Sequence, residues 1–393
     1  MNLRSLFLTH IAQTSDAPML LEVDRAEGIY IYSPDKKRYI DLIAGVSVSN
    51  LGHSHPKVVE AVKQQAERYM HLMVYGEYVQ SPQVQFATLL ASQLPASLSS
   101  VYLVNSGSEA NEGAIKLAKR YTGRTEVVAF RNAYHGSTQG SLSIIGDEEF
   151  RSSFRPLLPD VRSIQYNSEE DLSYITERTA CVVAEVIQGE AGIHLPQNSY
   201  LQKLRQRCSE VGALLVFDEV QTGFGRIGTL FAFQKYEVIP DILTIAKAMG
   251  GGMPIGGFVA SKEIMSSLTH NPVLGHITTF GGHPVSSAAA LASLEVILSE
   301  GLMDTVKEKE TAFRQQLVHS KIKEIRGDGL IMAVELGDEA TLMRFIRRGM
   351  ENGILSDWFL FCSTAFRISP PLTITLEEIH EVSALILKTL DEI

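Results

Sequence analysis

Cysteine, long hydrophobic runs and excess positive charge are all scarce in this sequence. The three cysteines, Cys181, Cys208 and Cys362, lie far apart without a C-x-x-C pair, which argues against a disulfide framework. No apolar run reaches the ~18 residues of a membrane helix, and residues 1–10 lack the apolar core of a signal peptide. The net charge of −10 does not favour nucleic acid as a partner, since nucleic-acid-binding proteins need a basic surface. We therefore expect a cytoplasmic protein without a membrane or nucleic-acid partner.

Short apolar runs, in contrast, are frequent in the middle of the 393-residue chain, where helix-like segments separate most of them. They are rich in Val, Ile, Leu and Phe, and they occupy residues 100–105, 125–130, 180–187, 213–218, 242–246 and 256–261. Such runs predict an α/β fold with a mainly parallel sheet that is covered by helices on both faces.

The two ends of the chain have a different pattern. From about Pro284, amphipathic helices alternate with short strand-like runs at 330–336 and 365–371, which predicts a smaller α+β domain. Residues 1–45 contain hairpin-like strands that we expect to pack with this domain. The predicted division is an N-terminal segment (1–45), a large α/β domain (46–285) and a small α+β domain (286–393).

A single charged residue, Lys247, lies in the stretch LTIAKAMGGGMPIGGFVAS, residues 243–261. A lysine in an apolar pocket is costly unless it is paired or neutralised. Three explanations are open at this point: the ammonium group is exposed, it is paired with a buried acid, or it is held in a covalent bond. The glycines that follow predict close backbone approach and a tight turn between two strands.

Small polar residues follow the first predicted strand of the sheet. Ser106, Gly107 and Ser108 come directly before a helix-like segment. Backbone N–H groups at a helix start form an anion site, and phosphate is the usual guest. An ordinary helix N-cap is the alternative. The motif is not a P-loop, because no G-K-[ST] follows.

Other residues with chemical potential also follow predicted strands. Tyr134 and His135 come after the second, Asp218 and Glu219 after the fourth, and Lys247 after the fifth. Ligands bind at the carboxyl ends of parallel strands, so we expect these side chains to meet there. A phosphate site, a stacking aromatic, a buried carboxylate and a lysine match the needs of pyridoxal 5′-phosphate (PLP). The lysine would form a Schiff base with the aldehyde, and the carboxylate would keep the pyridine nitrogen protonated.

Seven motifs and an N-terminal signature then identify a family resemblance that covers nearly the whole chain. They are LGHSHPKVVEAV, NSGSEANEGAIKLAK, YHGST, EVIQGEAG, DEVQTGFGR, the stretch around Lys247, TTFGGHP and FRISPPLT. The sequence resembles the class III, or ω-amino acid, aminotransferases of PLP fold type I. The resemblance implies a large domain with a mainly parallel seven-stranded sheet, a small α+β domain built from both chain ends, and a homodimer with shared active sites.

The resemblance also implies a role for each matching residue. Lys247 would be the Schiff-base lysine and proton carrier, Asp218 the partner of the pyridine nitrogen, and Glu185 a nearby supporting acid. The remaining cofactor contacts would be the ring hydroxyl (Gln221), the phosphate (Ser106, Gly107, Ser108), the ring face (Tyr134, with His135 nearby) and the partner subunit's phosphate (Thr279, or its neighbour Thr278).

Two further residues concern the substrate. Arg367 would grip the α-carboxylate of glutamate or 2-oxoglutarate in a bidentate pair. In similar enzymes a glutamate at the position of Glu190 pairs with this arginine and swings away when an α-carboxylate arrives. We expect a Glu190–Arg367 switch here. The alternative is that Glu190 is a solvated loop acid.

The sequence departs from the family at several positions. Relatives that use ornithine, acetylornithine or 4-aminobutyrate carry an arginine for the donor's distal carboxylate where this chain has Ser137. A serine cannot replace a guanidinium group. Either another cation, from near the segment MVYGEYVQ or from the other subunit, binds this carboxylate, or the donor lacks it, which favours diamines and amines. Tyr75 and Tyr78 lie near positions of substrate-contacting aromatics, and His283 replaces an asparagine; none of the three has an assigned role.

The predicted function is a PLP-dependent aminotransferase that moves an amino group from an ω-amino acid or amine, similar to ornithine or acetylornithine, to an oxo acid. We expect 2-oxoglutarate as the oxo acid and a ping-pong mechanism. Alternatives are a 4-aminobutyrate or diamine aminotransferase, and an aminomutase or decarboxylase. A catalytically silent relative would have lost Lys247 or Asp218, and a nicotinamide enzyme would need a G-x-G-x-x-G unit that we do not find. His53 and His55 could suggest a metal, but two histidines alone are a weak signal, and we expect none.

Overall fold

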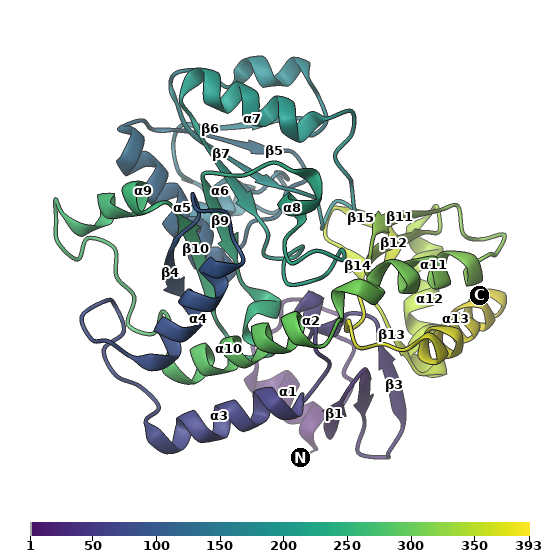
Figure 1. The fold of residues 1–393 in the computed structure, drawn as a ribbon. Coiled ribbons are helices and arrows are strands. Elements are labelled where there is room, and N and C mark those ends of the chain that lie inside the picture. Colours follow the sequence, from purple (N-terminus) through teal and green to yellow (C-terminus); the bar gives the residue numbers. More distant parts are fainter. Residues whose placement is uncertain (1) are drawn as a thin grey trace.

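The central element is a seven-stranded sheet, which the computed structural model describes along with the rest of residues 2–393 (Figure 1). Its strand order is β4-β10-β9-β8-β7-β5-β6, and only β10 runs antiparallel to its neighbours. The predicted mainly parallel sheet is therefore confirmed. The strands are β4 (Ser100–Val104), β5 (Glu126–Phe130), β6 (Val161–Ile164), β7 (Thr179–Glu185), β8 (Leu214–Asp218), β9 (Ile242–Ile245) and β10 (Gly256–Ala260).

Strand β6 was not predicted from the sequence. Its residues VRSI are only partly apolar, unlike the mostly apolar residues of the other edge strand β4, and three of the four are not fully buried, because β6 lies at one edge of the sheet. The inner strands β5, β7, β8, β9 and β10 are buried along their whole length, which explains their continuous apolar runs.

Helices cover both faces of this sheet and create two cores. On one face α5 (Gly107–Thr122) packs through small residues such as Ala110 and Ala114 against alternate strand residues. On the other face α7 (Tyr200–Val211), α4 (Ser81–Ser92) and α10 (Pro284–Ser299) contribute to a larger core. The other helices around this sheet are α3 (Pro56–Arg68), α6 (Gln139–Ser143), α8 (Ala232–Tyr236), α9 (Lys262–Ser266) and the 3₁₀ turns η1 (Ser152–Phe154), η2 (Glu170–Tyr174), η3 (Lys247–Gly250) and η4 (Ser267–Thr269).

A second sheet of four antiparallel strands lies in the C-terminal part, in the order β11-β12-β15-β14. Its strands are β11 (Glu324–Asp328), β12 (Ile331–Glu335), β14 (Trp358–Phe359) and β15 (Cys362–Ile368). Helices α11 (Val306–Gln316), α12 (Glu339–Asn352) and α13 (Leu376–Asp391) accompany it, and η5 (Met303–Thr305) precedes them.

Both chain ends contribute to a third sheet. Strands β1 (Arg25–Glu27), β2 (Tyr30–Tyr32) and β3 (Arg38–Asp41) form a meander, and β13 (Ile354–Leu355) adds to β3 in parallel. Ile29, Ile40 and Leu42 share a core with C-terminal residues. Two short helices, α1 (Leu3–His10) and α2 (Ala44–Ser47), flank this meander in the sequence.

The division into domains after residue 285 remains a prediction. Helix α10 starts at Pro284 and packs against α3, α4 and η3, which belong to the large sheet's surroundings. This packing favours a boundary after Ser299. Within residues 2–393 no single helix has the length and apolar composition to cross a membrane; α10 and the adjoining 303–316 segment meet those criteria only as a bent pair.

Candidate active site

A cavity of about 390 Å³ opens at the carboxyl ends of the central strands. This is the edge at which open parallel sheets bind their ligands. Nine of the residues selected from the sequence line it: Ser106, Gly107, Ser108, Tyr134, His135, Glu185, Asp218, Gln221 and Lys247. They belong to strands β7 and β8 or to the segments that follow β4, β5, β8 and β9, so the sheet brings them together from distant parts of the chain.

The start of helix α5 forms one wall of this cavity. Ser106 is its N-cap, and the Ser106 Oγ accepts the Glu109 N–H at 3.2 Å. The N–H groups of Gly107 and Ser108 belong to the first turn, where a helix offers them no internal partner. A Cβ on Gly107 would come within 2.9 Å of Val220, so glycine keeps this wall open. The helix start is thus both an ordinary N-cap and a site suited to an anion.

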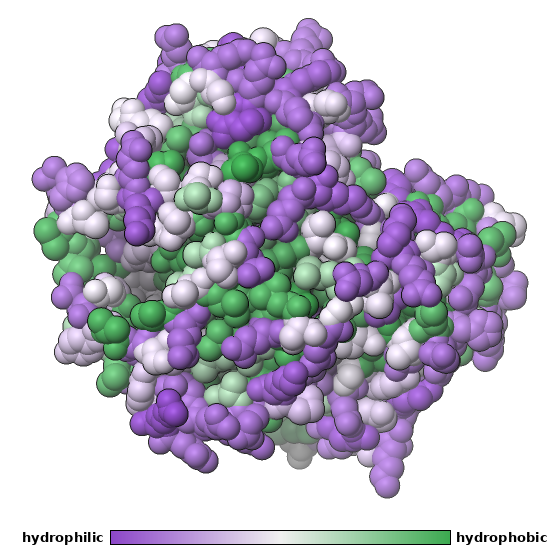
Figure 2. Space-filling model, viewed as in Figure 1, coloured by the Kyte–Doolittle hydropathy of each residue, from purple (hydrophilic) through white to green (hydrophobic). Residues whose placement is uncertain are grey.

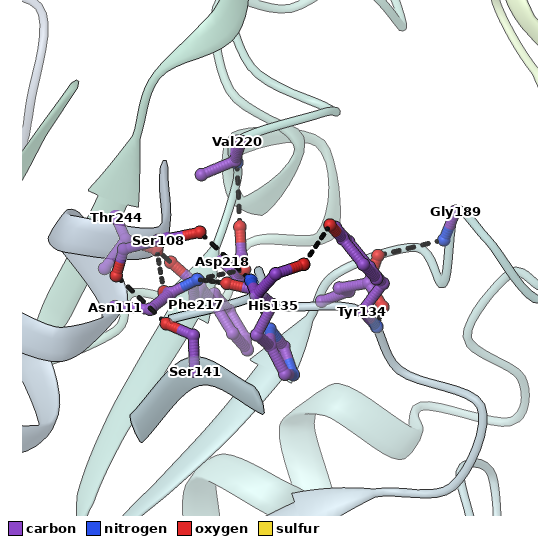
Figure 3. Close-up of polar contacts among 12 residues, drawn as sticks. Ser108, Asn111, Tyr134, His135, Ser141, Gly189, Phe217, Asp218, Val220 and Thr244 are labelled. Carbon is purple, nitrogen blue, oxygen red and sulfur yellow. Dashed lines mark hydrogen bonds and ion pairs between the residues drawn. The ribbon is translucent and has the colours of Figure 1, made fainter. Parts of the chain in front are cut away.

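Asp218 is held by a network of hydrogen bonds at the end of β8, shown in Figure 3. Its Oδ2 accepts from Asn111 Nδ2 at 2.8 Å and lies 2.8 Å from His135 Nδ1. Its Oδ1 accepts the Val220 N–H at 3.0 Å. Asn111 is held in turn, because its Oδ1 accepts from Thr244 Oγ1 at 2.9 Å. The carboxylate is 5% exposed and has a fixed orientation.

Two neighbouring groups respond electrostatically to Asp218. Burial alone would lower the pKa of His135, but the hydrogen bond and charge of Asp218, together with Glu185, raise it above its ordinary value. Burial raises the pKa of Glu185 to about 7, although His135 acts in the opposite direction. Glu185 accepts the N–H groups of Tyr134 at 3.2 Å and Gly189 at 3.0 Å. The cavity therefore contains an ion pair and a carboxyl group that titrates near neutral pH.

The acid next to Asp218 has a structural task. Glu219 is fully buried and accepts the N–H groups of Ala232 at 2.6 Å and Phe233 at 2.7 Å, at the start of α8. Successive strand residues point to opposite faces, so only Asp218 reaches the cavity.

Lys247 begins η3 directly after β9, with a positive φ of 49°. Burial lowers the pKa of its ammonium group, Glu190 opposes this effect, and Arg367 adds to it. The predicted turn is present: Gly251 has a φ of 56°, and a Cβ on Gly256 would lie 2.4 Å from the Ser106 carbonyl oxygen. Lys247 is thus biased toward the neutral amine, the form that acts as nucleophile and base.

Glu190 and Arg367 form a buried ion pair beside this cavity. Arg367 Nη2 donates to Glu190 Oε1 at 3.0 Å and to Oε2 at 3.1 Å, and the residues are 1% and 5% exposed. Although burial opposes both shifts, the pairing lowers the pKa of Glu190 and raises that of Arg367. The alternative of a solvated loop acid is therefore wrong for Glu190.

Comparison with known proteins agrees with this geometry. The family model for aminotransferase class-III matches residues 11–390. The chain belongs to the class III aminotransferases. It is 41% identical over 316 residues to the acetylornithine aminotransferase of Methanopyrus kandleri, and the match covers 80% of each chain.

Two solved structures show the same fold as this aminotransferase. The ornithine aminotransferase of Toxoplasma gondii, crystallised with partial occupancy of PLP, has a TM-score of 0.91 and 30% identity over 99% of this chain and 93% of that one. The ω-transaminase of Pseudomonas jessenii in complex with PMP has a TM-score of 0.92 and 26% identity over 100% and 98%. The protein is therefore a PLP-dependent transaminase of fold type I.

The residues of this aminotransferase fit PLP. The helix start of α5 suits the phosphate, and Asp218 is a buried acceptor for a pyridinium N–H. Gln221 Nε2, a donor, and His135 Nε2, a donor or acceptor, are buried without a partner in residues 2–393, as expected where a bound group completes their hydrogen bonds. When bound, PLP supplies an electron sink for the carbon next to the amino group.

The remaining sequence-selected residues of this aminotransferase lie outside the cavity lining. Thr278 Oγ1 accepts from Asn105 Nδ2 at 3.1 Å and from the Gly281 N–H at 2.9 Å, so its hydroxyl is engaged within its own chain. Thr279 is exposed. Ser137 is also exposed, with its Oγ 3.2 Å from the Tyr134 hydroxyl at the cavity edge.

Three residues without an assigned role lie elsewhere. Tyr75 and Tyr78 line a separate cavity of about 300 Å³ together with Thr278. His283 stacks on His71, with ring centroids 5.4 Å apart and planes 11° from parallel. His53 of the GHSHP motif is explained by the protein itself, because its Nε2 lies 2.8 Å from Asp41 Oδ2.

Sequence reasoning missed Asn111, Thr244 and Val220. Asn111 is an amide on the otherwise small and apolar face of α5, and Thr244 is the one polar residue of β9. A polar residue on a sheet-packed face was the available signal for both, since buried polar groups require partners. Val220 contributes an apolar wall to the cavity, and nothing in its composition distinguishes it from a core valine.

Proposed function

We propose that this aminotransferase transfers an amino group from an ornithine-like or other amine donor to an oxo acid, with 2-oxoglutarate as acceptor, in two half-reactions at one site. The Glu190–Arg367 pair carries this proposal. Without Glu190, a substrate that lacks an α-carboxylate would leave Nη2 of the buried arginine without a carboxylate partner. A carboxylate that pairs with it and can be displaced lets one site accept both kinds of substrate.

The residue roles belong to the same proposal. Lys247 Nζ would hold PLP covalently and carry the proton between substrate and cofactor carbons; its lowered pKa supports this. Asp218 would keep the pyridine nitrogen protonated, and Gln221 would bind the ring hydroxyl. Tyr134 would stack on the ring, and the start of α5 would bind the phosphate. His135 would support Asp218 through its hydrogen bond and charge, and Glu185 would hold the backbone at Tyr134 and Gly189 in place.

The donor is the open part of this function, and two observations point in different directions. Curated relatives at 36–41% identity are named acetylornithine aminotransferases, which favours an acetylornithine-like donor. Ser137 supplies no cation for a distal carboxylate, which favours a diamine or simple amine. A donor such as 4-aminobutyrate would need a cation from another element.

We further propose that a second copy of the chain completes the site. Apolar side chains are exposed on the surface near α4, including Val79 (95%), Val84 (49%) and Phe280 (55%). Figure 2 shows hydrophobic residues near the centre of the face that carries α4 and α10. Thr279 is exposed beside Phe280 and, unlike Thr278, is free to reach a partner subunit. The substitution Val84→Glu should give a monomer in light scattering, and Val318→Glu, a 76% exposed control, should not.

The experiment that tests the function measures the half-reactions one at a time. Glutamate, ornithine, acetylornithine, 4-aminobutyrate and putrescine are each added to the PLP-loaded enzyme without oxo acid, and the cofactor's visible absorbance is followed. We expect glutamate and one ω-amine to change the absorbance, and the responding amine names the donor. Absence of any change would contradict transamination with these partners. Release of CO₂, or an isomer of the substrate as product, would favour the decarboxylase or aminomutase alternatives.

A further inference from the structure

Arg367 has a second carboxylate partner that the proposed exchange with Glu190 does not use. Arg367 Nε donates to Asp357 Oδ1 at 2.8 Å. The Asp357 side chain is 26% exposed, whereas that of Arg367 is 2% exposed. Two acids on one buried arginine raise the question of why Glu190 alone would be displaced.

The two acids are attached to different parts of the fold. Asp357 immediately precedes β14, which pairs with β15, the strand of Arg367. The Arg367 N–H donates to the Asp357 carbonyl oxygen at 3.0 Å, and Ser356 Oγ donates to the Arg367 carbonyl oxygen at 2.7 Å. Glu190 instead follows β7 of the central sheet. Asp357 and Arg367 therefore belong to one hairpin. Glu190 reaches this hairpin from the side of the central sheet, where its carbonyl oxygen accepts the Phe361 N–H at 3.0 Å and its Oε2 accepts the Leu360 N–H at 3.2 Å.

The acids also occupy different donors of the guanidinium group. Asp357 accepts a hydrogen bond from Nε, and Glu190 accepts from Nη2 with both carboxylate oxygens. Nη1 is buried without a partner in residues 2–393. The ring of Phe359 lies under the group, with its centroid 4.4 Å from Cζ. If Glu190 leaves, Nη2 loses its carboxylate partner and keeps only a 3.5 Å contact with the Trp358 carbonyl oxygen. Together with the unpartnered Nη1 it then offers two donors that match a carboxylate in bidentate geometry.

We propose that Asp357 is a positioning residue that holds Arg367 by Nε, so that the Nη1–Nη2 edge stays directed at the substrate carboxylate while Glu190 is exchanged for it. This inference rests on the proposed function, because it assumes that a substrate carboxylate binds Arg367. It also explains how the arginine keeps a partner when Glu190 has gone. The role is specific to the carboxylate-bearing substrate and leaves the amine donor's own contacts unchanged.

The test compares Asp357→Ala with Asp357→Asn in the PLP-loaded enzyme. Asparagine retains the Oδ1 acceptor for Nε, and alanine removes it. Glutarate, a dicarboxylate that cannot react, is titrated calorimetrically. We expect Asp357→Ala to weaken glutarate binding about tenfold, the loss typical of one hydrogen bond to a charged group, and Asp357→Asn to stay within about threefold of the parent. The KM for 2-oxoglutarate should rise in parallel with kcat unchanged within about twofold.

Three results would overturn the inference. Asp357→Ala could leave glutarate binding and KM unchanged, Asp357→Asn could be as weak as Asp357→Ala, or kcat could fall while KM stays constant. A parent enzyme that binds glutarate but does not transaminate 2-oxoglutarate would contradict the proposed function alone, and the titration would still judge Asp357. A parent enzyme that does not bind glutarate would overturn the role of Asp357 as well.

Discussion

The two charged clusters beside the cavity, one around Asp218 and one around Arg367, are built differently. Asp218 receives neutral donors from Asn111 and the Val220 backbone and a charged one from His135, all of them around the central sheet. Arg367 is held by full charges, one from its own hairpin and one from the end of another sheet. Several hydrogen bonds from surrounding groups hold the Asp218 carboxylate in one orientation. An ion pair between separate elements, such as Arg367 and Glu190, can be exchanged for another. This contrast supports the proposal that the Asp218 side holds the cofactor in a fixed position and that adaptation to substrates occurs on the Arg367 side.

Removal of the lysine between the two clusters should have the largest effect. We expect Lys247→Ala to lower the transamination rate by about 10²–10⁴-fold or more, because the variant lacks the proposed proton carrier. The initial rate of the glutamate half-reaction measures this. Lys262→Ala, on an exposed position of α9, is the matched control and should retain the parent rate. A Lys247→Ala enzyme within tenfold of the parent would refute the assigned role.

The free energy of unfolding should depend on pH through Glu185, which lies on the Asp218 side of the cavity. Its folded pKa of about 7 lies above the ordinary value of 4.5, so the folded state binds the proton more tightly than the unfolded state. The contribution of Glu185 to stability is therefore lost as the pH rises from about 4.5 to 7. When the pH is raised from 5 to 8 without cofactor, the free energy of unfolding should fall by about 2 kcal/mol less in Glu185→Gln than in the parent.

Denaturant unfolding at the two pH values measures this difference. Glu149→Gln, an exposed acid, should show the parent's pH dependence and serves as the control. Equal pH dependence in the parent and Glu185→Gln would mean that the carboxyl group is solvated in the folded state.

On the Arg367 side, the loss of Glu190 should change the rates of the amine and glutamate half-reactions differently. We expect Glu190→Gln to slow the half-reaction of the amine donor about tenfold, because a buried arginine then loses a counter-charge that only this substrate needs. The glutamate half-reaction should be as fast or faster, since its α-carboxylate no longer displaces a charged competitor. Stopped-flow absorbance with each substrate separates the two. An equal loss in both would mean that Glu190 acts as a fixed part of the site.

The smallest effect is expected from the network behind Asp218. Asn111→Ala removes one donor to Oδ2 and should lower kcat/KM by about fivefold, equivalent to about 1 kcal/mol, because His135 and Val220 still hold the carboxylate. Thr244→Val removes only the bond that orients Asn111, so its effect should be smaller still. A Thr244→Val effect larger than that of Asn111→Ala would contradict this series of hydrogen bonds, in which Thr244 orients Asn111 and Asn111 holds Asp218.

The sequence by itself determined the class of fold and most of the cofactor side. Buried strands such as β7 and β8 read as continuous apolar runs, and the residue after such a strand must reach the ligand edge of a parallel sheet. That rule selected Asp218 and Lys247 from local pattern alone. Strand β6, at one edge of the sheet, was not predicted because its exposed positions carry polar residues that interrupt the apolar pattern.

Only the tertiary structure decided which of the selected groups meet and how each is held. It separated Asp218 from Glu219, made Glu190 a buried partner of Arg367, and brought Asn111 to Asp218, which is far away in the sequence. It also placed Asp357 against Arg367 across one hairpin. The physical reason is that a hydrogen bond or ion pair depends on distances of about 3 Å between atoms from different elements. The apolar pattern of one segment predicts whether that segment is a buried strand of the sheet or a helix. It does not predict the distances between side chains of different segments.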